Sequence, residues 1–312
     1  MPTRTARELE KQPTGAPVEE DLHALVTLAE RVTKHPAEIR PAEIATAAAT
    51  AQSRGEFLDA VGVIIGFNFV TRVANALGVD PEIPSWLGRF EFARHLARSS
   101  TAMLLRWFVD LSPRQPGLRP VEENLNALGR RFGEIGIESL PECFRPLKEA
   151  PHLLEVQREL FEAHLKQIGP AGKIGMDLCA FMAAGLTTLD EIGAPLLRGQ
   201  VAEWVQRHGT ESPDCLLNGG QESPCGSAPL DVVVARFARD VTRRSYSITN
   251  ERVEELRSLG LNDERILDLV CGIALWNACG RLEILLGGLP CSPEQALGPM
   301  SRSAQRQVAA TR

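Results

Sequence analysis

Two long apolar stretches decide the fold: FLDAVGVIIGFNFVTRVANALG at 57–78 and ILDLVCGIALWNACGRLEILLG at 266–287. The segments LAERVTKHPAEI at 28–39 and FARDVTRRSYSI at 237–248 align in the same register, since 238 − 29 = 209 and 287 − 78 = 209. A register that stays constant over this length predicts an internal duplication. Positions identical in both copies include Val32/Val241, Thr33/Thr242, Asp59/Asp268, Asn68/Asn277, Arg72/Arg281 and Gly78/Gly287.

Each copy is predicted to form a three-helix unit. It starts with an amphipathic helix, continues with a short second helix entered near Arg40 or Thr249, and ends in a long helix. The long helix is apolar around most of its circumference, and a helix of this kind is expected at the centre of a core.

The predicted fold class is all-α. Ala, Leu, Glu and Arg dominate between Pro and Gly breakers, and alternating β-branched runs are nearly absent. The expected helices cover residues 18–34, 41–53, 54–78, 85–110, 120–133, 139–149, 151–168, 171–185, 188–208, 228–244, 250–259, 263–287 and 292–297.

Capping residues suggest where some of these helices begin. Thr188 with Glu191, and Ser292 with Gln295, match the capping box, in which two side chains satisfy two backbone N–H groups at a helix start. Asn262 is a further N-cap candidate.

Proline and glycine suggest the domain organisation. SPRQPGLRP at 112–120 is the expected seam between two lobes, and the Gly-, Ser- and Pro-rich stretch 209–229 is expected to be a long surface loop. The predicted parts are a mobile tail at 1–17, an N-terminal lobe at 18–112, a C-terminal unit at 113–299 and a second tail at 300–312.

Composition excludes several classes of function. A net charge of −6 leaves no basic surface for nucleic acid, and no run of aromatic residues offers a stacking platform. The polar N-terminus does not resemble a secretory signal, and seven scattered cysteines suit a reducing cytoplasm. The most apolar runs, 57–70 and 266–279, are shorter than the roughly 20 residues of a membrane span. We therefore expect a soluble cytoplasmic protein with no membrane partner.

A family resemblance follows from the repeat. The pattern A-x-x-V-T, an Ile, a short helix, then L-D-x-V…N-x-x-x-R…L-G resembles the second half of the alkylhydroperoxidase D-like (AhpD-like, carboxymuconolactone decarboxylase) unit, over 28–80 and 237–289. This resemblance implies an AhpD-like helical bundle and a homo-oligomer. In redox members of the family it also implies a Glu-x-x-Cys-x-x-Cys…His arrangement, in which one thiolate attacks a peroxide and the second forms the resolving disulfide.

The chain departs from that redox motif because it contains no Cys-x-x-Cys. The nearest match, GKIGMDLCAFMAAG, has Cys179 alone and no following histidine. The resemblance therefore predicts a protein that binds or acts on a small organic molecule without thiol–disulfide peroxidase chemistry and without a cofactor. The alternatives are a non-catalytic oligomeric scaffold or binding protein, and a single-thiol peroxidase that uses Cys179 with an external reductant. Whether the protein is an enzyme stays open at this point.

Four polar residues stand one turn apart in the two apolar helices: Asn68, Arg72, Asn277 and Arg281. They could bind an anion or a carboxylate that faces a pocket. Alternatively, each Arg could pair with a carboxylate such as Asp59 or Asp268, or cap a neighbouring helix, because a buried charge must be compensated. Their presence in both copies favours the structural role.

A glutamate-rich helix offers a candidate metal site. Glu155, Glu159 and Glu162 share one face, with His164 on the same helix. No second helix carries the Glu-x-x-His that a four-helix di-metal site needs, so we predict a solvated charged face and no metal.

The two cysteines of the C-terminal long helix, Cys271 and Cys279, are eight residues apart. Along a helix this is roughly 12 Å, too far for a disulfide. We expect both to be small core residues.

Overall fold

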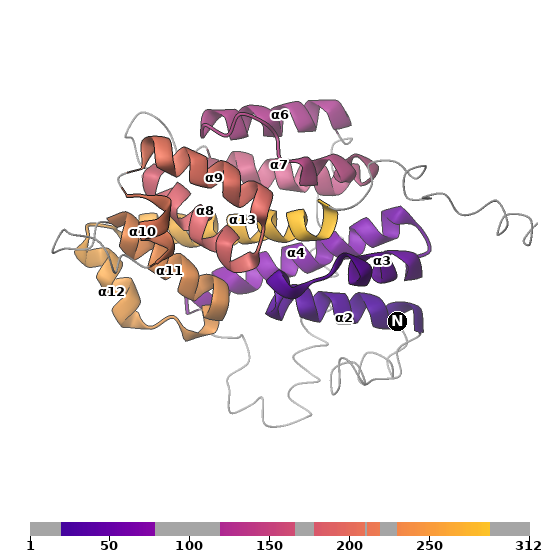
Figure 1. Cartoon of the computed structure of the whole chain (residues 1–312), viewed down its shortest axis with the longest axis horizontal. Coiled ribbons are helices and arrows are strands. Elements are labelled where there is room, and N and C mark those ends of the chain that lie inside the picture. The colour runs from indigo at the N-terminus through magenta and orange to yellow at the C-terminus, as the bar shows by residue number, and fades with distance from the viewer. Residues whose placement is uncertain (1–19, 79–118, 166–177, 210, 219–229, 288–312) are drawn as a thin grey trace, which may run out of the picture.

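The computed structural model describes residues 20–78, 119–165, 178–209, 211–218 and 230–287 (Figure 1). All regular elements in these ranges are helices, which confirms the all-α prediction for this part of the chain. The α-helices and the 3₁₀ helices (η) are α2 (Glu20–Lys34), η1 (Pro36–Glu38), α3 (Pro41–Thr50), α4 (Arg54–Ala76), α6 (Val121–Glu134), η3 (Glu142–Glu149), α7 (Pro151–Leu165), α8 (Leu178–Ile192), α9 (Pro195–His208), α10 (Pro213–Leu217), α11 (Leu230–Arg244), η4 (Ser245–Ser247), α12 (Asn250–Ser258) and α13 (Asp263–Leu286).

Helix α13 is the centre of the core. It runs through the middle of the molecule in Figure 1 and contacts α4, α7, α8, α9, α11 and η3. Its side chain Trp276 packs against Phe181 of α8, with ring centroids 5.2 Å apart. Gly185 makes room for this indole, because a Cβ there would lie 2.6 Å from the Trp276 ring. A helix with apolar residues on all sides is stable only where neighbours cover it all round.

Helix α4 packs along α13 but keeps one apolar face outside. Val63, Phe67 and Val70 are between 63% and 72% exposed. Both α4 and α13 are long and apolar enough to cross a membrane, at 23 and 24 residues, which is longer than the apolar runs in the sequence suggested. The most apolar window of α13 is 89% buried and that of α4 only 33%. The prediction of a core helix is thus confirmed for α13, whereas most of the apolar window of α4 is not buried.

The two stretches of the proposed repeat contain the same elements in the same order, α2–η1–α3–α4 and α11–η4–α12–α13. The helix starts follow the offset of the sequence: Pro36 of η1 and Ser245 of η4 are 245 − 36 = 209 residues apart, and Arg54 of α4 and Asp263 of α13 are 263 − 54 = 209 apart.

The predicted helix start at Thr188 is wrong. Residue 188 lies inside α8, which continues to Ile192. The chain then turns at Gly193, whose φ of +78° is the left-handed conformation that glycine adopts without strain, and α9 begins at Pro195. The helix boundary therefore follows the glycine and the proline.

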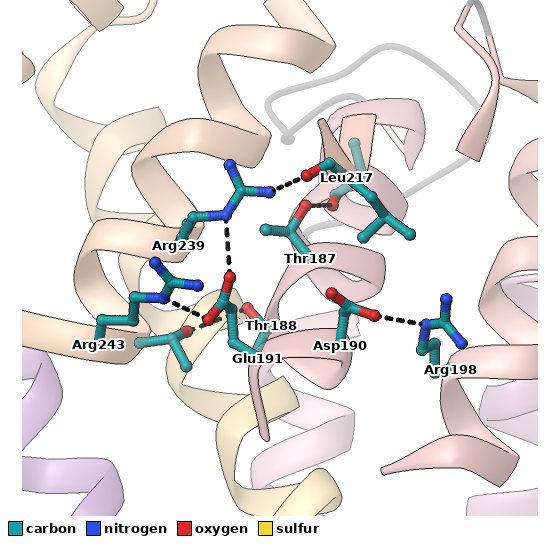
Figure 2. Close-up of polar contacts among 10 residues, drawn as sticks. Thr187, Thr188, Asp190, Glu191, Arg198, Leu217, Arg239 and Arg243 are labelled. Atoms are coloured by element: carbon teal, nitrogen blue, oxygen red, sulfur yellow. Dashed lines mark hydrogen bonds and ion pairs between the residues drawn. The ribbon is translucent and has the colours of Figure 1, made fainter. Parts of the chain in front are cut away.

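The side chains of the supposed capping box bind another helix instead (Figure 2). The Glu191 carboxylate accepts from Arg239 Nε at 2.9 Å and also from Arg243, both on α11. Thr242 of α11 donates to Thr188 at 3.4 Å. Both residues thus fix α11 on α8, a contact that local sequence does not encode.

Other boundaries are confirmed or corrected. Asn262 caps α13 as predicted, because its side chain accepts from Arg265 N at 2.9 Å. The helix expected at 139–149 is a 3₁₀ helix, with Pro146 inside it. The expected loop 209–229 contains the short helix α10, which Ser212 caps.

Several predictions lie outside the described residues: the helices at 85–110 and 292–297, the capping box of Ser292 and Gln295, most of the seam at 112–120, and the tails at 1–17 and 300–312.

Candidate functional site

A pocket of about 270 Å³ opens between α4, α7 and α13. Four positions of α13 contribute to it at helical spacing, so that they share one face of the helix. The lining combines four apolar residues with three polar or titratable ones: Phe69, Leu160, Leu267 and Leu275, with His164, Asp268 and Cys271.

His164 is the most unusual of these residues. Its side chain is 9% exposed, and Nε2 is buried without a hydrogen-bond partner among the described residues. Burial lowers the His164 pKa to about 4, so the imidazole is neutral at neutral pH. The ring packs against Phe181, and a Cβ at Gly272 would lie 2.9 Å from Nε2. The glycine therefore leaves room for the ring edge.

Asp268 and Cys271 lie one turn apart on α13. Burial, and then the charge of Glu264, raise the Asp268 pKa. Burial, and then the charge of Asp268, raise the Cys271 pKa. The thiol stays protonated at neutral pH, which leaves it a poor nucleophile.

The prediction that Cys271 and Cys279 are both core residues is confirmed for only one of them. Cys279 is fully buried, and burial raises its pKa well above the usual value. Cys271 is half-buried and lines the pocket, because its helix face points at α7 and α4, which leave a gap there.

Cys179 lies away from the pocket lining, in the first turn of α8. Its Sγ donates to the backbone carbonyl of His208 at 3.6 Å, at the end of α9. The structure therefore places this candidate residue at a helix contact.

The two Asn residues on the long helices make matching contacts. Asn68 Nδ2 donates to Thr33 Oγ1 at 3.0 Å, and Asn277 Nδ2 donates to Thr242 Oγ1 at 3.0 Å. Each also donates to the carbonyl four residues before it, Ile64 in α4 and Ile273 in α13. The Asn side chains thus link each long helix to the first helix of its own stretch.

The two Arg residues also match. Arg72 Nη1 donates to Asn68 Oδ1 at 2.6 Å, and Arg281 Nη1 donates to Asn277 Oδ1 at 2.7 Å. Arg281 Nε reaches across to the carbonyl of Val32, at 3.1 Å, in the last turn of α2. This last contact is a helix cap, because the final carbonyls of a helix have no partner within it.

Neither carboxylate considered from the sequence is bound to these arginines. Asp59 lies 2.9 Å from Nε2 of His152, and Asp268 lines the pocket. None of Asn68, Arg72, Asn277 and Arg281 belongs to the pocket lining.

The glutamates of α7 surround an arginine. Arg158 is almost fully buried and lies within ion-pair distance of Glu155, Glu159 and Glu162, at 3.6, 3.2 and 2.5 Å. Within the described ranges no cluster of His, Cys, Asp or Glu is arranged to hold a metal ion. The three glutamates therefore face the guanidinium group of Arg158, an ion pairing that the sequence analysis did not predict.

Sequence reasoning also missed the pocket. The signal was present in part, since Leu267, Cys271 and Leu275 recur at intervals of four. The same spacing fits a core stripe, however, and nothing in the sequence shows that α7 and α4 leave a gap opposite it.

Comparisons of the chain with protein-family models, with curated proteins and with solved structures gave no match.

Proposed function

We propose that this protein binds a small, largely apolar organic molecule in the pocket between α4, α7 and α13. The observation that carries the proposal is His164, which lines this pocket and whose buried Nε2 has no hydrogen-bond partner among the described residues. A buried polar atom without a partner costs about 1–3 kcal/mol, and a ligand that hydrogen-bonds to it recovers that cost. The pocket thus favours a molecule with an apolar body and a hydroxyl or amine group.

The size of the pocket limits the ligand. An apolar cavity of roughly 150 Å³ is enough to hold benzene. A volume of about 270 Å³ therefore accommodates a single substituted ring or a branched aliphatic molecule of similar size.

The titratable groups favour binding over catalysis. A general base works best with a pKa near the working pH, and the His164 pKa of about 4 makes the imidazole a weak base. The raised pKa of Cys271 keeps its sulfur protonated, which disfavours nucleophilic attack. We therefore propose a binding protein first and an enzyme second.

Phenol and toluene test this proposal, because they differ by a hydroxyl in place of a methyl group. Isothermal titration of the full chain should show tighter binding of phenol than of toluene. Replacing His164→Phe should abolish that preference, a loss of about five- to tenfold, since a neutral hydrogen bond contributes about 1 kcal/mol. The matched control is Cys179→Ser, outside the pocket, which should keep it.

A second variant tests binding in the pocket independently of the hydrogen bond to His164. Cys271→Phe fills the cavity and should reduce binding of both compounds. Unchanged binding in Cys271→Phe, or a phenol preference that persists in His164→Phe, would rule out this pocket as the site.

We also propose that 28–78 and 237–287 are copies of one unit and that the chain is an AhpD-like bundle. The common element order and the matching Asn and Arg contacts support the duplication. The family assignment rests on the sequence pattern alone and stays a prediction, as does the cytoplasmic location.

The alternative of an oligomeric scaffold draws on the exposed face of α4. Apolar patches of this kind often mark contacts between proteins. If copies of the chain associate through this face, Phe67→Glu should reduce the mass measured by light scattering. Leu196→Glu, an equally apolar exposed position on α9, should leave it unchanged.

A further inference from the structure

Six polar side chains, five of them buried and the exposed Thr33 at one edge, form a connected network, and we call them the central polar cluster. They come from four helices, α2, α4, α11 and α13, and comprise two hydroxyls, two amides and two guanidinium groups: Thr33, Thr242, Asn68, Asn277, Arg72 and Arg281. We propose that this cluster binds one small anion, such as chloride or a small carboxylate, between Arg72 and Arg281.

The hydrogen bonds leave the cluster short of acceptors. Arg281 directs Nη1 to Asn277 and Nε to the carbonyl of Val32. Arg72 directs Nη1 to Asn68 in the same way, but its Nε is buried and has no partner in the described part of the chain. An acceptor beside Arg72 Nε would give Arg72 the second hydrogen bond that Arg281 Nε already makes to Val32.

The charges of the cluster also lack a counter-charge among the described residues. Arg72 is 7% exposed and Arg281 is 1% exposed, and neither forms an ion pair with a described carboxylate. The two guanidinium groups lie close enough for the charge of Arg72 to lower the Arg281 pKa, after the larger effect of burial. Burying like charges together without a counter-charge is costly, and a bound anion removes most of that cost.

Another buried arginine of the same chain shows how the charge of a buried guanidinium is usually balanced. Arg158 is almost fully buried, and three glutamates surround it. In the central polar cluster the acceptors that the described residues offer the guanidinium groups are neutral oxygens. Side chains of α7 supply the counter-charge to Arg158, whereas none of the described carboxylates supplies one to Arg72 or Arg281, and a bound anion would fill that role.

The chemistry of the cluster points to a small anion. Guanidinium N–H groups form charge-assisted hydrogen bonds to anions, and their planar fork suits a carboxylate. Because five of the six side chains are buried, a compact anion fits better than an extended one. The cluster shares no residue with the α4–α7–α13 pocket, so this inference stands apart from the proposed function.

The test is thermal unfolding of the full chain at constant ionic strength, with gluconate replaced stepwise by chloride, formate or phosphate. Binding to the folded state raises the melting temperature in a saturable way. We expect saturation in the millimolar range for chloride or formate, and loss of the rise in Arg72→Gln and in Arg281→Gln. Arg198→Gln removes the same charge at the surface, where Arg198 pairs with Asp190, and should keep the rise.

Chloride-35 NMR line broadening gives a second readout, by comparing wild type with Arg72→Lys, which keeps the positive charge. Broadening in wild type that falls in Arg72→Lys and disappears in Arg72→Gln supports the site. A response only at molar concentrations, or one that Arg72→Gln retains, overturns the proposal. It is also overturned if none of chloride, formate and phosphate raises the melting temperature of the wild-type protein.

Discussion

Glu283 offers the sharpest test of how the core is held together. This α13 side chain is 6% exposed and accepts from two backbone N–H groups at the start of α9, Leu196 N and Leu197 N, each at 2.8 Å. The N-cap residue of α9 is Ala194, whose side chain cannot cap a helix. Glu283 thus performs the capping role from another helix, and its negative charge lies at the positive end of the α9 dipole.

The expected cost of removing the carboxylate follows from these contacts. A hydrogen bond to a charged group contributes about 1.5–3 kcal/mol, and the loss of an ordinary N-cap costs about 1 kcal/mol. The two bonds share one carboxylate, so their contributions are not additive. We expect Glu283→Ala to lower the free energy of unfolding by about 3 kcal/mol. Glu283→Gln keeps one acceptor oxygen but loses the charge, and should cost about half as much.

Urea unfolding followed by circular dichroism measures this effect. With a denaturant slope of about 3 kcal/mol per molar urea, Glu283→Ala should lower the midpoint by about 1 M. Glu264→Ala is the matched control, because Glu264 lies on the same helix but is exposed. If Glu283→Ala unfolds at the same urea concentration as Glu264→Ala, the tertiary cap does not stabilise α9 and the reasoning fails.

Two further predictions concern titration and sulfur chemistry. The His164 pKa is about 4 in the folded protein and 6.5 in the unfolded chain. The neutral imidazole therefore keeps its full contribution to the free energy of unfolding above pH 6.5, and this contribution is lost as the pH falls to 4. The loss should reach about 3 kcal/mol, and the difference in unfolding free energy between wild type and His164→Phe should change with pH only in this window. Cys179 Sγ contacts a backbone carbonyl and the sequence contains no Cys-x-x-Cys, so peroxide consumption with a dithiol reductant should be slow and equal in wild type and Cys179→Ser. Fast turnover that the substitution abolishes would favour the single-thiol peroxidase instead.

The sequence by itself determined the helical class and much of the helix layout. Helix-forming composition between Pro and Gly breakers fixes the class, and the apolar circumference of 266–287 identifies the core helix. Asn262 was recognisable as a cap because an N-cap acts on N–H groups only two or three residues away. Such features depend on local backbone geometry, which neighbouring residues encode.

Only the tertiary structure decided the features that join distant segments. Thr188 and Glu191 have capping-box spacing, yet they lie inside α8 and bind Thr242, Arg239 and Arg243 of α11. The cap on α9 likewise comes from Glu283, 86 residues after Leu197.

The pocket depended on tertiary structure for the same reason. His164 and Cys271 have ordinary helical spacing, and only the packing of α7, α4 and α13 leaves a cavity between them. Side-chain periodicity shows which face of a helix is apolar. It does not show which neighbour covers that face or where the covering is incomplete, because those depend on contacts between residues far apart in the chain.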